Sequence, residues 1–186
     1  MKFLIVGLGN PGPEYELNRH NIGFLTLDRL AEKQEIEFTQ SKLGDTASFK
    51  TKGRSIYLLK PNTYMNRSGK ALNYWLQQLK ISVDNCLIVT DDIALPFGKL
   101  RMRAKGSSAG HNGLKDIESV VGSSQYPRLR FGVGNDFAKG KQVDYVLGNF
   151  PVEEIEKLPL LMDRAGEMIL SFCTIGINRT MSQYND

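Results

Sequence analysis

The sequence predicts one α/β domain, a single-domain sandwich in which helices flank a mixed, largely parallel central sheet. Apolar runs at residues 3–6 and 86–89 contain no polar break, which is typical of strands covered on both faces. Amphipathic segments separate these runs, as in a sheet built from strand–helix–strand units. With 186 residues, 41% of them hydrophobic, the chain suffices for one sizeable core and is too short to argue for two.

The first strand ends in an abrupt turn over residues 7–13, which contain three glycines and two prolines. Open α/β sheets bind their ligands at the carboxyl edge of such strands. Asn10 in the turn and His20 just before the next amphipathic segment are therefore the first candidate site residues.

The patterns that follow alternate between helical and extended periodicity. Apolar residues recur at helical spacing after residue 21, where Asn21 is the expected helix cap. The expected elements in this part of the chain are helices over 21–33 and 66–80 and strands over 46–51, 55–60 and 86–89. The last of these strands leads directly into Asp91 and Asp92.

A basic strand is expected over residues 99–105, because three apolar residues alternate there with four cationic ones. The cationic residues are Lys99, Arg101, Arg103 and Lys105. Their side chains share one strand face at intervals of roughly 6.5 to 7 Å, close to the phosphate spacing of a nucleic-acid strand.

The distribution of charge also favours a polyanionic partner. Between Lys99 and Lys141 nine basic residues stand against three acidic ones, although the net charge of the whole chain is only +4. A basic region on a near-neutral body most simply binds a nucleic acid, and a solvated positive face is the alternative.

A helix over 112–121 and a strand over 128–133 follow, and the chain is helical in character from residue 150 onward. Pro159 is expected to divide the helical C-terminal region, residues 150–186, into two pieces. No apolar run approaches the roughly 20 residues of a membrane span, and the start of the chain does not resemble a cleavable leader. These features predict a cytoplasmic protein. Cys86 and Cys173 stand far apart in apolar sequence and are expected to be buried free thiols.

His20 is the candidate general base. Asp91 ends a buried strand, and a carboxylate bonded to the imidazole would fix its tautomer and leave the other ring nitrogen to take a proton from water. A surface or core histidine is the structural alternative. The pair Asp91-Asp92 could instead hold a magnesium ion, although no third carboxylate lies near it in sequence.

Three asparagines, Asn10, Asn66 and Asn112, each stand where a loop meets an element. Singly, each is typical of a cap or turn residue. Together they would offer carboxamides that donate to and accept from a peptide backbone without adding charge. Met65 offers a soft apolar surface for a base or sugar, with core filling as the alternative.

Two glycine motifs match other functions formally and fail on context. G-x-G-x-x-G at 7–12 matches the dinucleotide fingerprint, but prolines crowd the start of the required helix and no strand ending in an acidic residue follows at the required distance. G-x-S-x-G at 106–110 matches a serine-hydrolase elbow with Ser108 as nucleophile, but the only later histidine, His111, is too close to serve from a separate loop. A flexible turn is the better interpretation.

Five stretches, taken in order, resemble the bacterial-type peptidyl-tRNA hydrolases. They are GLGNPGPEYELNRHNIGF, KPNTYMNRSG, DDIALPFGKLRMR, GSSAGHNGLKDI and RLRFGVG. The resemblance covers nearly the whole chain up to Asn149. It implies a monomeric, cytosolic esterase without cofactor or metal that splits peptide from tRNA when translation aborts, with a mobile C-terminal helical region beside the cleft.

The resemblance also implies roles for individual residues. The implied catalytic residues are His20 as base, Asp91 as its carboxylate partner, and Asn10. The implied substrate-binding residues are Tyr15, Met65, Asn66 and Asn112, and the implied tRNA phosphate contacts are Arg101, Arg103, Lys105 and Arg130. Small departures from the family pattern occur at Asn18, Asp92 and Ser107-Ser108-Ala109, none of them a catalytic position.

The expected function is hydrolysis of the ester bond between a peptide and the terminal ribose of tRNA, by water that His20 activates. Two alternatives remain open. One is a non-catalytic RNA-binding protein of the same fold, for example a splicing factor, and the other is a serine esterase that uses Ser108.

Overall fold

Seven strands form one sheet, and the computed structural model describes residues 1–185 of the chain. The strands are β1 (Lys2–Gly7), β2 (Thr39–Ser41), β3 (Gly44–Thr51), β4 (Arg54–Pro61), β5 (Cys86–Asp92), β6 (Leu100–Arg103) and β7 (Arg128–Gly132). Their order in the sheet is β2-β3-β4-β1-β5-β7-β6. The central strands β4, β1, β5 and β7 are parallel, and the pairings at both edges are antiparallel. This arrangement confirms the predicted mixed, largely parallel sheet.

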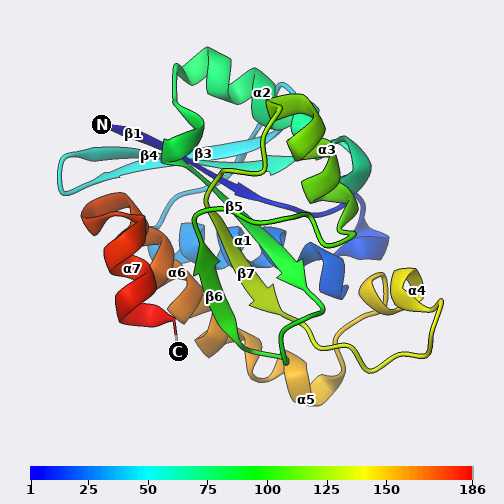
Figure 1. The fold of residues 1–186 in the computed structure, drawn as a ribbon. Coiled ribbons are helices and arrows are strands. Elements are labelled where there is room, and N and C mark those ends of the chain that lie inside the picture. The colour runs from blue at the N-terminus through cyan, green and yellow to red at the C-terminus, as the bar shows by residue number, and fades with distance from the viewer. Residues whose placement is uncertain (186) are drawn as a thin grey trace.

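Helices cover both faces of the sheet (Figure 1). They are α1 (Ile22–Lys33), α2 (Ser68–Leu79), α3 (Asn112–Val121), α4 (Gln142–Val146), α5 (Val152–Ile155), α6 (Leu158–Ile175) and α7 (Ile177–Tyr184). Apolar residues of α2 and α3 pack on one face, and those of α1 and α6 pack on the other. The last helix, α7, lies against the edge strand β6. No helix in residues 1–185 combines the length and apolar character that a membrane crossing requires.

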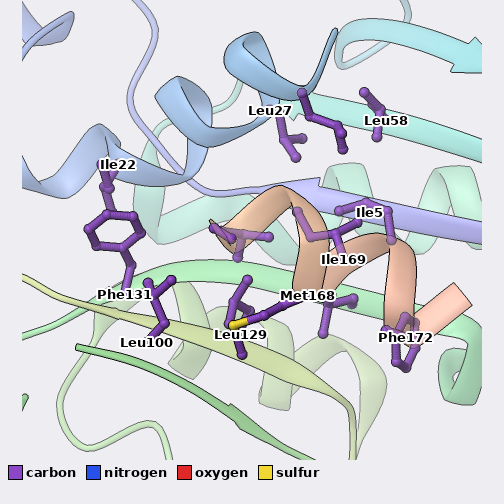
Figure 2. Close-up of a cluster of buried hydrophobic side chains, with 14 of the residues drawn as sticks. Ile5, Ile22, Leu27, Leu58, Leu100, Leu129, Phe131, Met168, Ile169 and Phe172 are labelled. Carbon is purple, nitrogen blue, oxygen red and sulfur yellow. The ribbon is translucent and has the colours of Figure 1, made fainter. Parts of the chain in front are cut away.

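The hydrophobic core has two parts, one on each face of the sheet, because alternate residues of a buried strand point to opposite faces. Figure 2 shows the larger part, where Met168 of α6 points toward the sheet, which contributes residues such as Ile5 and Leu129. The smaller part lies beneath α2 and α3. Cys86 and Cys173 are buried free thiols, as predicted.

The structure adds β2 and α4 to the elements that the sequence predicts. β2 has three residues and α4 has five, which is too short for periodicity to identify them. The predicted division of the C-terminal helices falls next to Pro159, because α5 ends at Ile155 and α6 begins at Leu158. Pro159 lies in the first turn of α6, where its missing N–H has no helical partner to lose. The breaks fall between α5 and α6 and at Gly176, whose φ of 90° ends α6.

The glycines of the first turn allow close packing between β1 and α1. A Cβ on Gly7 would overlap the backbone of Gly23, and a Cβ on Gly23 would lie 2.6 Å from the carbonyl oxygen of Val89. A Cβ on Gly9 would lie 2.8 Å from the ring of Phe24. The contact of α1 with the sheet therefore accounts for Gly7 and Gly9 of the pattern that formally matched a dinucleotide fingerprint, and the φ of 121° at Gly12 accounts for the third glycine.

Replacing Gly23 by alanine is expected to lower the free energy of unfolding by about 1–3 kcal/mol, the usual cost of overpacking, because the colliding atoms belong to backbone. Urea denaturation measures the change. Gly166→Ala in α6 is the matched control, since its Cβ would lie 3.6 Å from Leu30 and alanine favours a helix. A Gly23→Ala protein as stable as wild type would contradict the proposed packing.

Candidate active site

A cleft of about 740 Å³ opens at the carboxyl ends of β1 and β5. Its walls come from the turns that follow these strands, from the loop over 107–112, from the short helical turn at Met65–Arg67 and from α4. Parallel strands bring their carboxyl ends to the same edge of a sheet, so residues far apart in sequence meet here.

Asp91 at the end of β5 bonds two imidazoles at the floor of the cleft. His20 Nδ1 lies 2.8 Å from Asp91 Oδ2, and His111 Nε2 lies 2.8 Å from Asp91 Oδ1. The Asp91 side chain is 2% exposed and both histidine side chains are 10% exposed. The structure thus brings together His20 and Asp91, which the sequence analysis paired, and adds His111.

The hydrogen bonds of His111 fix its tautomer. His111 caps α3, and its Nδ1 accepts the backbone N–H groups of Gly113 and Leu114 at 3.1 and 3.3 Å. A nitrogen that accepts carries no proton, so the proton of neutral His111 is on Nε2 and is donated to Asp91. Thr90 Oγ1 lies 2.9 Å from the same Nε2.

The same reasoning fixes the tautomer of His20. Asp91 accepts at both oxygens, so His20 Nδ1 donates and Nε2 of the neutral ring is left without a proton. No group in residues 1–185 forms a hydrogen bond with His20 Nε2, and His20 lines the cleft. This nitrogen is the free base of the site.

The charges around Asp91 shift the pKa values of both His20 and Asp91. Burial by itself lowers the pKa of His20, but the charge of Asp91 and its hydrogen bond outweigh burial and raise the pKa above its ordinary value. Burial alone would raise the pKa of Asp91, but the adjacent His20 and His111 hold that pKa well below its usual range. Asp91 is therefore a carboxylate at neutral pH, and His20 is a stronger base than a free histidine.

Asn10 is held so that its amide N–H group faces the cleft. Asn21 clamps the Asn10 backbone from both sides, accepting its N–H at 2.8 Å and donating to its carbonyl at 2.9 Å. Asn10 Oδ1 accepts the backbone N–H of Met65 at 2.7 Å, and Nδ2 has no acceptor among the described residues. Asn21 stands at the cap position of α1 as predicted, but its side chain makes this clamp instead of a cap.

The other predicted cleft residues differ in exposure. Met65 is buried and lines the cleft beside Asn10, whereas Asn66 and Asn112 line it with exposed side chains. Tyr15 is half-buried and is not among the lining residues, so its predicted role in substrate binding stays a prediction.

Arginines occupy the face of the sheet next to the cleft. Arg101 pairs with Arg130 and Arg103 with Arg128 across β6 and β7, with no helix of the α2–α3 layer over them. Burial, then Arg101 and Arg130, lower the pKa of Arg103. Opposed like charges destabilise a sheet, so this arrangement favours an anion at this face. Arg130 also lines the cleft, while Lys105 is exposed beyond the end of β6.

Arg128 departs from the other arginines because it is fully buried. Its Nη2 donates to the carbonyls of Ser124 and Tyr126 at 2.6 and 3.2 Å, and its guanidinium lies 3.9 Å from the Tyr126 ring centroid. The alternation with Arg130 indicates a shared face, but nothing in the sequence indicates that one of the two is turned into the protein.

The wall opposite the loop over 107–112 comes from α4, whose Val143 lines the cleft. Arg19 ties α4 to the turn that carries His20. Its Nη1 donates to the Tyr145 carbonyl at 2.9 Å, and its guanidinium lies 3.9 Å from the ring centroid of Tyr145. The predicted place of residues 150–186 beside the cleft stays a prediction. Residues 150–185 are not among the lining residues, and they pack through α6 on α1 and through α7 on β6.

The alternative chemistries find little support in the geometry. Asp92 does not join Asp91, since its carboxylate accepts the backbone N–H of Ala94 at 2.8 Å and lies 3.7 Å from Arg130. His20, Asp91 and His111 place donor atoms within 4.8 Å of one another, but both carboxylate oxygens of Asp91 already accept hydrogen bonds from the two rings. Ser108 lines the cleft, yet no described base forms a hydrogen bond with its hydroxyl.

An imidazole held by a buried carboxylate beside an open cleft, on a mixed α/β sheet, is an arrangement typical of a hydrolase. A sequence model of the family described as Peptidyl-tRNA hydrolase matches residues 4–186. The chain belongs to the peptidyl-tRNA hydrolase family.

Individual members of this family are similar to the chain over nearly its full length. The chain is 53% identical over 185 residues to a Bacteroides fragilis protein named peptidyl-tRNA hydrolase, covering 100% of this chain and 99% of that protein. It is 55% identical to the protein of that name from Porphyromonas gingivalis, covering 100% of both. The crystal structure of peptidyl-tRNA hydrolase from Acinetobacter baumannii superposes with a TM-score of 0.92 at 34% identity, covering 98% of this chain and 94% of that one.

The pH dependence of kcat/KM for an N-blocked aminoacyl-tRNA tests the pairing of His20 with Asp91. The base acts only when neutral, so activity falls as pH drops through a pKa above the ordinary value of about 6.5. In Asp91→Asn the charge that raises the pKa of His20 is gone and burial lowers it. The acid limb is expected to move to lower pH while the maximal rate falls at least about tenfold. An unmoved acid limb would contradict the pairing.

Proposed function

We propose that the protein hydrolyses the ester bond between a peptide and the terminal ribose of tRNA, with His20 as general base. The observation that carries the proposal is the open Nε2 of His20, fixed by Asp91 and His111 at the floor of the cleft. Membership in the peptidyl-tRNA hydrolase family supports the choice of ester.

The reaction follows from the positions of the free donor and the free base. His20 Nε2 takes a proton from water, and the water oxygen bonds to the ester carbonyl carbon. The negative charge that develops on the carbonyl oxygen is stabilised by the free Nδ2 of Asn10. The ester C–O bond then breaks, and the proton on His20 passes to the ribose oxygen that leaves. Asp91 stays ionised throughout and stabilises the imidazolium.

The cleft would bind the peptide through its backbone. Asn66 and Asn112 expose carboxamides along the wall, and such groups bind peptide N–H and C=O without regard to the side chains. An enzyme that clears many different peptides needs this indifference. Asn10 and His20, which are buried, are placed for the ester itself.

The arginine face would position the tRNA through its phosphates. Three arginines project from β6 and β7 at one edge of the sheet: Arg101, Arg103 and Arg130. Lys105 lies just beyond the end of β6. Contacts with phosphates fix orientation and carry little information about sequence. Selection of the substrate would therefore depend on the shape of the tRNA end and on the blocked amine of the peptide. We infer that the enzyme works as a monomer in the cytoplasm, where peptidyl-tRNA forms.

The two alternatives each conflict with the geometry. A binding protein without activity has no need of an imidazole whose tautomer is fixed by two hydrogen-bonded neighbours. A serine esterase needs a base bonded to Ser108, and among the described residues neither imidazole forms a hydrogen bond with the Ser108 hydroxyl, although Nε2 of His20 is free.

Replacing His20 by alanine is expected to lower kcat by about a hundred- to ten-thousandfold, the usual contribution of a general base. Ser108→Ala is expected to leave kcat within a few-fold, whereas the serine esterase model requires near-total inactivation. The assay measures release from N-blocked and from free aminoacyl-tRNA, and the blocked form is expected to react much faster. Near-normal activity in a folded His20→Ala protein would refute the role of His20.

The amide of Asn10 provides a separate test. In Asn10→Asp the carboxylate still accepts the N–H of Met65 but presents no donor to the developing oxyanion. The expected result is a fall in kcat of roughly a hundred- to a thousandfold, with some loss of stability because the new carboxylate is buried. Single-turnover rates with N-blocked aminoacyl-tRNA and thermal unfolding measure the two effects. Equal kcat in Asn10→Asp and wild type would exclude Asn10 as the oxyanion donor.

A further inference from the structure

The strand that carries Arg101 and Arg103 is poorly supported by the sheet. β6 has four residues, lies at the edge of the sheet and pairs only with β7. Arg101 stands opposite Arg130 between these two strands, and both act on Arg103, so the repulsion among these three arginines acts directly on β6. An edge strand of this length also leaves backbone groups open on its outer side.

Asn185 closes that outer side. Its Oδ1 accepts the backbone N–H of Met102 at 2.9 Å, and its Nδ2 donates to the carbonyl of Met102 at 2.9 Å. The side-chain amide therefore makes both hydrogen bonds that a neighbouring strand would make to this residue. Met102 stands between the two arginines, and its side chain is fully buried.

Asn185 is itself held in place by α7. Its backbone N–H donates to the carbonyl of Met181, in the last turn of that helix. Within α7, Thr180 is buried and its hydroxyl lies 2.7 Å from the hydroxyl of Ser171 in α6. The guanidinium of Arg164 in α6 lies 5.3 Å from the ring centroid of Tyr184. The amide thus connects β6 to a helix packed on the core, on the face opposite the arginine side chains.

We propose that Asn185 is a positioning residue for tRNA, acting through the strand that presents Arg101 and Arg103. The amide holds the backbone of Met102. This contact fixes the position of β6, and with it the direction of the Arg101 and Arg103 side chains, against the repulsion from β7. This inference rests on the proposed contact of these arginines with tRNA phosphates. Asn185 touches neither the ester nor the base, so its effect is on binding and not on the chemical step.

The test compares Asn185→Ala with wild type on two substrates. On N-blocked aminoacyl-tRNA, KM is expected to rise about three- to tenfold with kcat unchanged, as fits the loss of two neutral hydrogen bonds. On an N-blocked aminoacyl-adenosine, which carries no phosphate, kcat/KM is expected to be unchanged. Exchange of the Met102 amide hydrogen is expected to become faster, because its acceptor is gone. Asn178→Ala, an exposed position on the same helix, is the matched control and is expected to match wild type.

A double-mutant cycle with Arg103→Ala separates positioning from general destabilisation. If Asn185 acts through β6 and its arginines, the double variant Asn185→Ala with Arg103→Ala has a KM only slightly above that of Arg103→Ala alone. Additive effects on KM, equal losses on both substrates or a wild-type KM in Asn185→Ala would each overturn the inference. A raised KM in Arg103→Ala with a wild-type KM in Asn185→Ala overturns this inference alone. A wild-type KM in Arg103→Ala overturns the phosphate contacts of the proposed function, and this inference with them.

Discussion

The site depends on one buried carboxylate that accepts hydrogen bonds from two imidazoles. Asp91 can take both because it has two oxygens and because the N-terminus of α3 has already oriented His111. The chain of constraints runs from the backbone of α3 through His111 and Asp91 to a single nitrogen of His20. A base with a fixed tautomer needs no rearrangement when the proton moves, and that preorganisation is the physical content of the proposed chemistry.

Backbone packing brings this network and the amide of Asn10 together. The absence of a Cβ at Gly7 and Gly23 lets α1 lie directly on β1, so the turn that holds His20 comes close to the end of β5. Asn21 then fixes the backbone of Asn10 from both sides. The positions of base and donor are consequences of how closely a helix approaches the sheet, and a small change in that packing would move both.

The charges of the molecule are arranged at a cost in stability. Arginine stands opposite arginine on β6 and β7, and one of these four guanidinium groups, that of Arg128, is buried against backbone carbonyls, with no carboxylate of residues 1–185 bonded to it. Such groups repel one another and lose hydration, so they are typical of a surface shaped for an anion. The helices of the C-terminal region support this edge from the opposite face and leave the cleft wall to α4.

The sequence by itself determined the layered α/β fold, because short unbroken apolar runs such as 86–89, separated by amphipathic segments, are typical of strands buried on both faces. It also indicated His20, Asp91 and Asn10, since polar residues that follow buried strands meet at one edge of a sheet. Only the tertiary structure decided that His111 shares Asp91, that Asn21 clamps Asn10 and that α4 forms a wall of the cleft. These contacts join segments far apart in the chain, and no local periodicity records which side chains will meet.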